Sequence, residues 1–433
     1  MSRRVVCVNP PGLPGTTANR EGAGGMGNVY PETGAFLYPP HTLATVAGAL
    51  RDGGLEVAAR DCALEQDSVG QAVSWVASQT PTWVVAQVSW ATRDADAAFL
   101  RAVRAALGKV PIVAVGASVA WMEDALRSVP DVAWLLGEPE RLLGLFLTLL
   151  GTDVSRWQGP LSLSMLQGAG LPDARRAASL DNLPRPAWDL FRWQGYGMLT
   201  VVGSKGCDHA CAYCPYVVAQ GNRFRPRPVD EVADEMAYLA RAYRPGRVVF
   251  RDPVFARDRD RVLALCEALA RRRVRLAWEC ESRADDLDAE LARAMAKAGC
   301  ATVKLGLESA DTGVLAAVRR VRDTAAAEVY RGRVLAAARA CASHGIAVRV
   351  FLLTGLPHED ESAIAETGRF VAEMRPSALH VKVVERYPGT AVDWAVPVED
   401  AKRRAEVLRG SWMPTSASAR RGLWQRVKGR LGR

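Results

Sequence analysis

The sequence lacks long hydrophobic runs: no stretch of about 18 uncharged apolar residues occurs, so we expect no membrane-spanning helix. A secretory signal is also missing, because Pro10 interrupts the first apolar stretch too early for a signal-peptide core. Hydrophobic residues make up 49% and charged residues 24% of the 433 residues, as in soluble globular proteins. We therefore expect a soluble, cytoplasmic protein long enough to form two domains.

A disulfide framework is absent as well. The nine cysteines are odd in number and scattered, and six of them are single residues in apolar or helical patterns. A small buried side chain is the usual role of such a cysteine. Only Cys207, Cys211 and Cys214 stand close together, and these three need a chemical explanation.

Positive charge exceeds negative charge only in the last 33 residues of the sequence. Residues 401–433 contain ten Lys or Arg and one acid, which accounts for the whole net charge of +9. Basic and acidic residues cancel in the rest of the chain, so the charge gives little support to nucleic-acid binding. We expect residues 396–433 to form a solvated basic tail, with docking to an acidic partner or surface as the alternative.

The first 150 residues alternate between apolar strands and helical patterns. Strands are expected at residues 5–10, 55–61, 82–90, 111–117 and 132–137, with helices between them. This alternation predicts an α/β domain, a doubly wound parallel sheet of the Rossmann-like type. In such sheets ligands bind beyond the carboxyl ends of the strands, where this sequence has Asn9, Pro10, Ser89, Gly116, Gly137 and Glu138.

A second αβ series follows an irregular, proline-containing segment, residues 151–195, which we expect to be a linker. Within residues 196–395, strand patterns occur at 198–207, 247–253, 275–283, 302–310, 348–357 and 379–390, again with helical patterns between them. Six strands are too few for a closed eight-stranded barrel and predict a partial (β/α)6 barrel of the TIM type. The chemistry of such a barrel lies at the carboxyl ends of its strands.

The three clustered cysteines follow the first strand of this second series with the spacing CxxxCxxC. Thiolate ligands favour iron–sulfur clusters or zinc. A zinc site needs a fourth ligand, and His209 lies too close in the same loop to be an obvious one. Three cysteines suit a [4Fe–4S] cluster with one open iron. The motif, with Tyr213 just before the last cysteine, resembles the signature of the radical S-adenosylmethionine (SAM) superfamily.

That resemblance implies that the open iron binds SAM and that the reduced cluster cleaves it to a 5′-deoxyadenosyl radical. The resemblance also extends to the ends of the later strands. There the sequence is similar to one subgroup of the superfamily, which includes anaerobic porphyrin cyclases and cobalamin-dependent methylases. This resemblance implies cofactor contacts for Tyr213, Asp252, Glu281, Arg283, Glu308 and Ser309, with Tyr213 by the adenine and Asp252 near an ammonium group. An ion pair of Glu281 with Arg283 on the solvent side is the structural alternative.

The amino-terminal region carries a set of residues at its strand ends and ahead of its first helix: Asn9, Pro10, Tyr38, Ser89, Gly116, Gly137 and Glu138. With them the region resembles the cobalamin-binding domain of the same subgroup, which implies corrin contacts for these residues. Ala117 departs from the pattern, which has a second glycine there. The Asp-x-His-x-x-Gly motif that supplies a histidine to cobalt elsewhere is absent, so the lower cobalt face is expected to lack such a ligand. A domain that keeps the fold but binds no corrin is the alternative.

Taken with this resemblance, the sequence predicts a cobalamin-dependent radical SAM enzyme that methylates an unactivated carbon in natural-product biosynthesis, using methylcobalamin. The alternatives are cyclisation or rearrangement with cobalamin as redox partner, and a non-catalytic iron–sulfur or corrin carrier or sensor. Expected partners are a small-molecule substrate and an external electron donor such as flavodoxin or ferredoxin. Nucleic-acid modification is disfavoured, because no second cysteine trio precedes Cys207. No catalytic residue is identified.

Overall fold

The computed structural model describes residues 4–31, 36–141, 143, 154, 157–161 and 179–412. The chain divides into two compact units. The first comprises Met1–Thr200, Val218–Gly221 and Arg225–Pro228, and the second comprises Val201–Val217, Asn222–Phe224 and Val229–Arg433. Within the described residues, no helix is both long enough and apolar enough to span a membrane.

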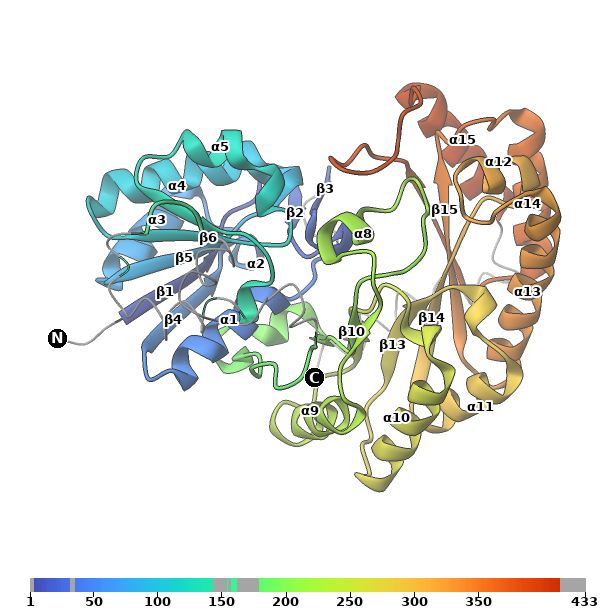
Figure 1. The fold of residues 1–433 in the computed structure, drawn as a ribbon, viewed down its shortest axis with the longest axis horizontal. Helices are drawn as coiled ribbons and strands as arrows, with labels where there is room; N and C mark the ends of the chain where they lie inside the picture. The colour runs from blue at the N-terminus through green and yellow to red at the C-terminus, as the bar shows by residue number, and fades with distance from the viewer. Residues whose placement is uncertain are drawn as a thin grey trace. The chain divides into compact units, whose positions relative to one another are not determined.

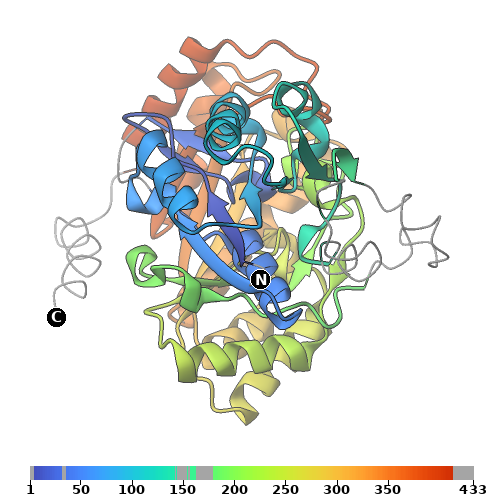
Figure 2. The same cartoon turned by 90° about the vertical axis from the view of Figure 1, so that its left-hand side faces the viewer.

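The first unit contains a six-stranded parallel sheet in the order β4-β1-β5-β6-β7-β8. Figure 1 labels its strands β1, β4, β5 and β6, and Figure 2 shows the same ribbon turned by 90°. The strands are β1 (Arg4–Asn9), β4 (Glu56–Asp61), β5 (Trp83–Gln87), β6 (Ile112–Val115), β7 (Val132–Leu135) and β8 (Gly159–Leu161). The expected doubly wound sheet is confirmed, and β8 is an addition that falls in the expected linker. Strand order reverses between β1 and β5, where such sheets bind ligands.

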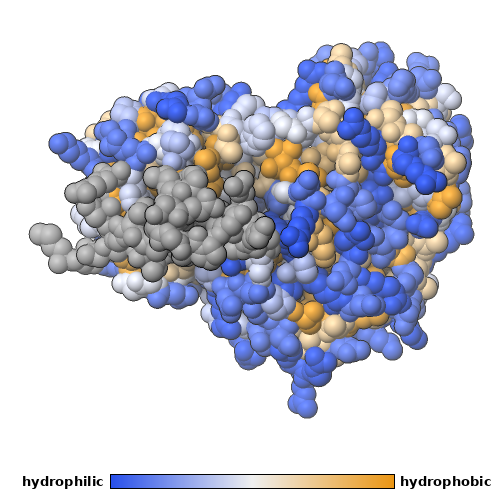
Figure 3. Space-filling model, in the orientation of Figure 1, coloured by the Kyte–Doolittle hydropathy of each residue, from blue (hydrophilic) through white to orange (hydrophobic). Residues whose placement is uncertain are grey.

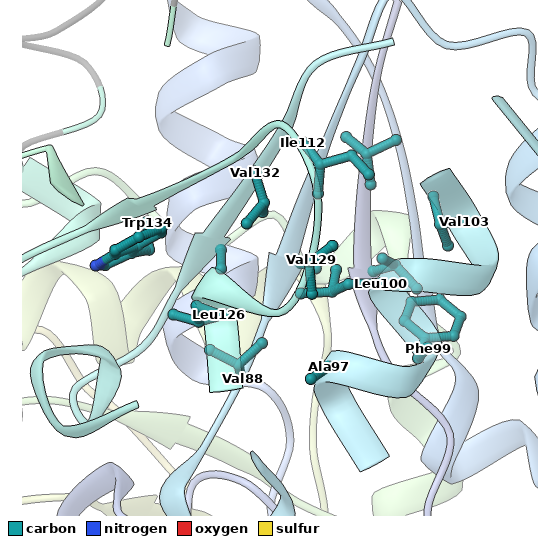
Figure 4. Close-up of a cluster of buried hydrophobic side chains, with 14 of the residues drawn as sticks. Val88, Ala97, Phe99, Leu100, Val103, Ile112, Leu126, Val129, Val132 and Trp134 are labelled. Atoms are coloured by element: carbon teal, nitrogen blue, oxygen red, sulfur yellow. The ribbon is translucent and has the colours of Figure 1, made fainter. Parts of the chain in front are cut away.

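Helices pack on both faces of this sheet. Figure 1 shows α3 (Val69–Ser78), α4 (Arg93–Leu107) and α5 (Glu123–Arg127) on one side and α1 (His41–Asp52) on the other. The cluster in Figure 4 joins Phe99 and Leu100 of α4 and Leu126 of α5 to buried strand residues. Short elements complete the unit: β2 (Thr17–Asn19), η1 (Ala23–Gly25), β3 (Asn28–Tyr30), α2 (Cys62–Glu65), η2 (Trp90–Thr92), η3 (Val119–Trp121), η5 (Trp188–Leu190) and η6 (Trp193–Tyr196).

The segment before the second strand series packs on the first unit rather than running free. The Ala187 amide donates to the Ala44 carbonyl at 2.9 Å, and Trp188 is fully buried. The Tyr196 hydroxyl donates to the buried carboxylate of Asp61, at the end of β4. Of the expected linker, residues 151–153, 155, 156 and 162–178 lie outside the described residues.

The second sheet also has six strands, in the order β16-β15-β14-β13-β12-β9. These are β9 (Leu199–Val201), β12 (Val248–Phe250), β13 (Trp278–Ser282), β14 (Cys300–Glu308), β15 (Ala347–Thr354) and β16 (Ala378–Val383). The four pairings from β12 to β16 are parallel. Each expected strand is present, and the strands follow one another in chain order, which confirms the partial (β/α)6 barrel.

The helices of the second unit begin where the sequence supplies caps. Asp258, Asp288, Asp311, Asp323 and Asp360 each accept a hydrogen bond from the first turn of the helix that follows. The helices are α8 (Pro215–Gln220), α9 (Val229–Ala242), α10 (Arg259–Arg271), α11 (Ala289–Lys297), α12 (Thr312–Ala317), α13 (Thr324–Ser343), α14 (Glu361–Met374) and α15 (Val398–Ser411), with η7 (Phe255–Arg257) and η8 (Ala284–Asp286). On the face shown in Figure 3 their surface is mostly hydrophilic.

Helix α15 lies where we expected a basic tail. Ala401, Ala405 and Leu408 are buried, and the helix packs against β15 and β16. The Thr354 hydroxyl donates to the Ala401 carbonyl at 2.9 Å, and Arg409 donates to the Val381 carbonyl at 2.7 Å. A narrow stripe of apolar residues therefore orders this basic segment as far as Ser411. The rest of the expected tail, residues 413–433, lies outside the described residues.

Candidate functional site

The loop that carries the three cysteines begins just after β10 (Ser204–Lys205), which pairs with β11 (Arg225–Pro226). Asp252 holds the start of this loop: one carboxylate oxygen accepts from the Gly203 amide at 2.7 Å and the other from the Ser204 hydroxyl at 2.6 Å. Arg261 donates to the Gly203 carbonyl at 2.6 Å. Asp252 is almost completely buried, so it anchors the loop, and its expected contact with an ammonium group stays a prediction.

The cysteine thiols are free and lie close enough to influence one another. None of the nine cysteines forms a disulfide. Burial raises the pKa of Cys207, and burial together with the charge of Cys211 raises the pKa of Cys214 to about 12. Metal ions bind thiolates, so a bound metal would have to displace these protons. The donor set itself, three sulfur atoms on one loop, fits an iron–sulfur cluster with one open iron.

A second group of potential metal ligands lies in the same loop. Ligand atoms of Cys207, Asp208 and His209 lie within 4.8 Å of one another. Asp208 is engaged, because Arg257 donates to its two oxygens at 3.0 Å and 2.7 Å. The three cysteines are therefore a better soft-metal ligand set than this mixed trio.

Two guanidinium groups approach the Cys211 sulfur. Arg283 Nη1 lies 3.9 Å and Arg320 Nη1 lies 4.0 Å from Cys211 Sγ. Arg283 also makes a bidentate pair with Asp285, at 2.9 Å and 3.0 Å, so the structural alternative, an ion pair of Glu281 with Arg283, is not what the structure shows. Both positive charges would stabilise an anionic cluster on the cysteines.

Arg320 organises the residues around Cys211. It donates to the Tyr330 hydroxyl at 3.1 Å and 3.0 Å, to the Tyr213 hydroxyl at 3.4 Å, and to the Gly306 carbonyl. Tyr330 donates to the same carbonyl at 2.7 Å. Arg320 and Tyr330 were not among the predicted residues, because they follow the cysteines by more than 100 positions and only the fold brings them to Cys211.

The other predicted residues of the second unit take different positions. Glu308 is buried at the end of β14, with a positive φ of 68° and a register shift beside it. Burial raises the pKa of Glu308, and the nearby Arg320 opposes that shift. Glu281 lies on β13, and burial raises its pKa too. The Ser309 hydroxyl accepts from the Asp311 amide at 3.1 Å and lies 3.3 Å from the Thr367 hydroxyl, so internal contacts engage it.

In the first unit, the carboxyl ends of β1 and β5 are tied together by a buried ion pair that the sequence analysis did not identify. Arg20 and Asp96 lie 2.5 Å apart, and both side chains are almost fully buried. Arg20 also donates to the Asn9 side chain at 3.2 Å and to the Pro10 carbonyl at 2.7 Å. Asp96 accepts from the Ser89 amide at 3.0 Å. Asn9, Pro10 and Ser89 thus meet at the reversal of strand order, as expected.

A glycine-rich segment lies against these strand ends. A Cβ atom on Gly27 would lie 2.3 Å from the Ser89 hydroxyl, and one on Gly25 would lie 2.6 Å from the Ala117 Cβ. A Cβ atom on Gly116 would lie 2.3 Å from the Val88 carbonyl oxygen, just after β5, and Gly137 has a positive φ of 114°.

The two remaining candidates make contacts of their own. Glu138 accepts from Arg225 at 2.6 Å, and the Tyr38 ring lies 4.6 Å from that of Phe36. Corrin contacts for the whole predicted set stay predictions.

Comparisons with known proteins agree with this architecture. Residues 201–371 match the family model of the radical SAM superfamily. An uncharacterized methyltransferase of Pyrococcus horikoshii, PH0819, is 23% identical over 217 residues, covering 49% of this chain and 46% of the relative. The chain thus spans less than half the length of this and the next curated relatives that it matches.

Two solved structures resemble nearly the whole chain. The radical SAM methyltransferase TsrM of Kitasatospora setae, solved with cobalamin and a [4Fe–4S] cluster, has a TM-score of 0.68 and 18% identity, covering 93% of this chain and 78% of its own. The cobalamin-dependent radical enzyme OxsB, with aqua-cobalamin and SAM, has a TM-score of 0.62 and 15% identity, covering 94% and 56%. At these identities the likeness establishes the fold.

Proposed function

Because residues 201–371 form a radical SAM domain and the chain thereby belongs to the radical SAM superfamily, we propose that it is a cobalamin-dependent radical SAM methyltransferase. Its reaction would add a methyl group to an unactivated carbon of a small molecule in natural-product biosynthesis. Methyltransferases recur among its relatives and among the structures that share its fold, which supports this choice.

The observation that carries the proposal is the cysteine loop at one end of the six-stranded sheet. Cys207, Cys211 and Cys214 provide three sulfur ligands, and Asp252 fixes the start of the loop. Arg283 and Arg320 place positive charge beside Cys211, and Tyr213 is buried in the same loop, where we expect it to contact the adenine of SAM. A cluster bound here supplies the electron that cleaves SAM, and cobalamin supplies the methyl group.

The first unit supports cobalamin as the second cofactor. Its strand order reverses between β1 and β5, the position at which sheets of this type bind a large ligand. The buried Arg20–Asp96 pair makes the ends of these two strands rigid, and the glycines beside them let backbone approach a ligand closely. The structures of TsrM and OxsB, both solved with cobalamin, share the fold of 93% and 94% of this chain.

An external one-electron donor, such as flavodoxin or ferredoxin, is part of the proposal. The six cysteines outside the loop are buried, and within the described residues none of them belongs to a group of three potential metal ligands whose ligand atoms lie within 4.8 Å of one another. Nine thiols without a disulfide also fit the reducing cytoplasm, where we propose that the protein acts.

The test is anaerobic reconstitution of the full chain, followed by analysis of iron, sulfide and cobalamin and of 5′-deoxyadenosine formed from SAM after reduction. The triple variant Cys207→Ala, Cys211→Ala, Cys214→Ala should lose both the cluster and SAM cleavage. Cys266→Ala, which removes a buried thiol outside the loop, should keep both. An intact cluster in the triple variant would overturn the assignment.

The same experiment separates the alternative functions. A wild-type protein that holds a cluster but forms no 5′-deoxyadenosine would be a carrier or sensor. For an active enzyme, product mass decides, because methylation adds one methyl group to the substrate whereas cyclisation adds none.

A further inference from the structure

The second sheet has one face that its helices do not cover. Along β15, Val348, Val350, Leu352 and Thr354 are buried, whereas Arg349, Phe351 and Leu353 alternate with them and are partly exposed. Thr354 bonds to α15, so the buried set faces the helices. Lys304 pairs in register with Arg349, His380 with Phe351, and Lys382 with Leu353, which places them on the opposite face. We call this the inner face.

The inner face holds more cations than its acids neutralise. Glu279 is buried and receives three of them: Arg247 at 2.8 Å, Lys304 at 3.3 Å and Arg349 at 3.6 Å. Glu281 also faces Lys304 and Lys382, but burial raises its pKa, so it offsets less positive charge than an exposed carboxylate would.

At the edge of this face, Phe351, His380 and Lys382 form a compact group. The rings of Phe351 and His380 are stacked, with centroids 5.2 Å apart and an angle of 28° between their planes. Lys382 Nζ lies 5.9 Å from the Phe351 centroid, and no carboxylate of the described residues forms an ion pair with it. Both His380 and Lys382 are exposed. The group thus presents a flat ring pair and an available ammonium to solvent.

The behaviour of His380 is consistent with a positive potential at this position. His380 is exposed as a residue, but its imidazole is stacked on Phe351 and loses part of its hydration. This loss, together with the positive charges of Arg349, Lys382 and Lys304, lowers the pKa of His380 to about 4. The imidazole is therefore neutral near pH 7 and can stack on a planar ligand without adding charge.

We propose that the inner face of β15 and β16 binds the substrate through a carboxylate or phosphate group beside a planar ring, with Lys382 as the ion partner and the stacked Phe351 and His380 as the platform. Arg349, which shares Glu279 with two other cations, adds to the attraction. This assignment rests on the proposed function, because it names the substrate class of that enzyme: a small planar anion.

The test uses phenyl phosphate and benzoate as probes and measures their binding to the reconstituted protein by calorimetry. Wild-type protein should bind both, and benzamide, which has the ring without the charge, should bind at least about tenfold more weakly. Lys382→Gln should weaken binding of the two anions at least about tenfold, and Phe351→Leu should weaken it as well. Lys402→Gln, on the exposed side of α15, should bind like the wild type.

The proposal would be overturned if the wild type bound neither phenyl phosphate nor benzoate, or if Lys382→Gln bound them as tightly as the wild type does. Binding of a single-stranded oligonucleotide that phenyl phosphate does not displace would overturn it as well. Iron and sulfide contents are measured for Lys382→Gln as well, so that weak anion binding can be compared at equal cluster content. Weak anion binding at normal iron content concerns this site alone, whereas a cluster that survives in the triple cysteine variant concerns the proposed function alone.

Discussion

Arg320 Nη1 lies 4.0 Å from Cys211 Sγ, and the guanidinium has no carboxylate in an ion pair among the described residues. Its other hydrogen bonds go to neutral oxygens of Tyr213, Tyr330 and Gly306. Arg283 approaches the same sulfur but is paired with Asp285. Arg320 is therefore the less neutralised of the two charges beside Cys211, and it stays protonated because the nearby phenols and Cys211 raise its pKa against the effect of burial.

Arg320→Gln should make the reduction potential of the reconstituted cluster more negative. Reduction adds a negative charge, which a nearby guanidinium stabilises, so removing that guanidinium disfavours the reduced form. A redox titration followed by electron paramagnetic resonance measures this shift. Arg320→Lys should shift it less, and Arg322→Gln, whose side chain is 85% exposed, should not shift it. An unchanged potential in Arg320→Gln at full iron content would contradict the role.

Asp252→Asn should loosen the start of the cysteine loop. The buried carboxylate accepts hydrogen bonds from the Gly203 amide and the Ser204 hydroxyl, and an amide cannot accept both in the same way. We expect a loss of about 1–3 kcal/mol in the free energy of unfolding. Iron incorporation should fall in parallel.

Chemical denaturation and iron analysis measure the two effects, with Asp260→Asn as the control because its side chain is 96% exposed. Normal stability together with normal iron content in Asp252→Asn would mean that the loop does not depend on this anchor.

The sequence was most informative where the signal is local. Apolar strand patterns that alternate with helical patterns predicted both parallel sheets, because each pattern can be recognised within a short run of consecutive residues. The three cysteines were recognisable for the same reason. Arg20, Asp96, Arg320 and Tyr330 were not, since a single Arg, Asp or Tyr has no pattern of its own. The contacts of Arg20 with Asp96 and of Arg320 with Cys211 join positions far apart in the chain.

The order of α15 was hidden by its composition. The segment is rich in Arg and Lys, and this charge concealed the spacing of Ala401, Ala405 and Leu408, which places three apolar residues on one side of a helix. Strand β8 was missed for a different reason: three residues, Gly159–Leu161, are too few for an alternating pattern, and only pairing with β7 reveals them.

Gly116→Ala should destabilise the first unit. Gly116 has a φ of 153°, and a Cβ atom there would lie 2.3 Å from the Val88 carbonyl oxygen, so the backbone of two strand ends would have to separate. We expect a loss of about 1–3 kcal/mol in the free energy of unfolding, measured by denaturant titration.

Gly70→Ala is the matched control, because a Cβ at this position in α3 meets no atom within 4 Å and should raise stability by about 0.5–1 kcal/mol. Equal stability of Gly116→Ala and the wild type would show that the strand ends can separate at little cost.

His380 should report the positive potential of the inner face through its titration. Its pKa of about 4 lies below the ordinary value of about 6.5, so between these values the unfolded chain binds more protons than the folded one. The contribution of His380 to stability is therefore complete above about pH 6.5 and is lost as the pH falls toward 4. Lys382→Gln should raise the pKa of His380, because one of the cations that lower it is gone, and bound phenyl phosphate should raise it in the wild type.

Nuclear magnetic resonance of the imidazole measures this pKa, with His380→Gln to assign the signal. A pKa near 6.5 for His380 in the wild type would show that the inner face lacks the positive potential needed to hold an anion. A pKa that neither Lys382→Gln nor phenyl phosphate changes would show the same.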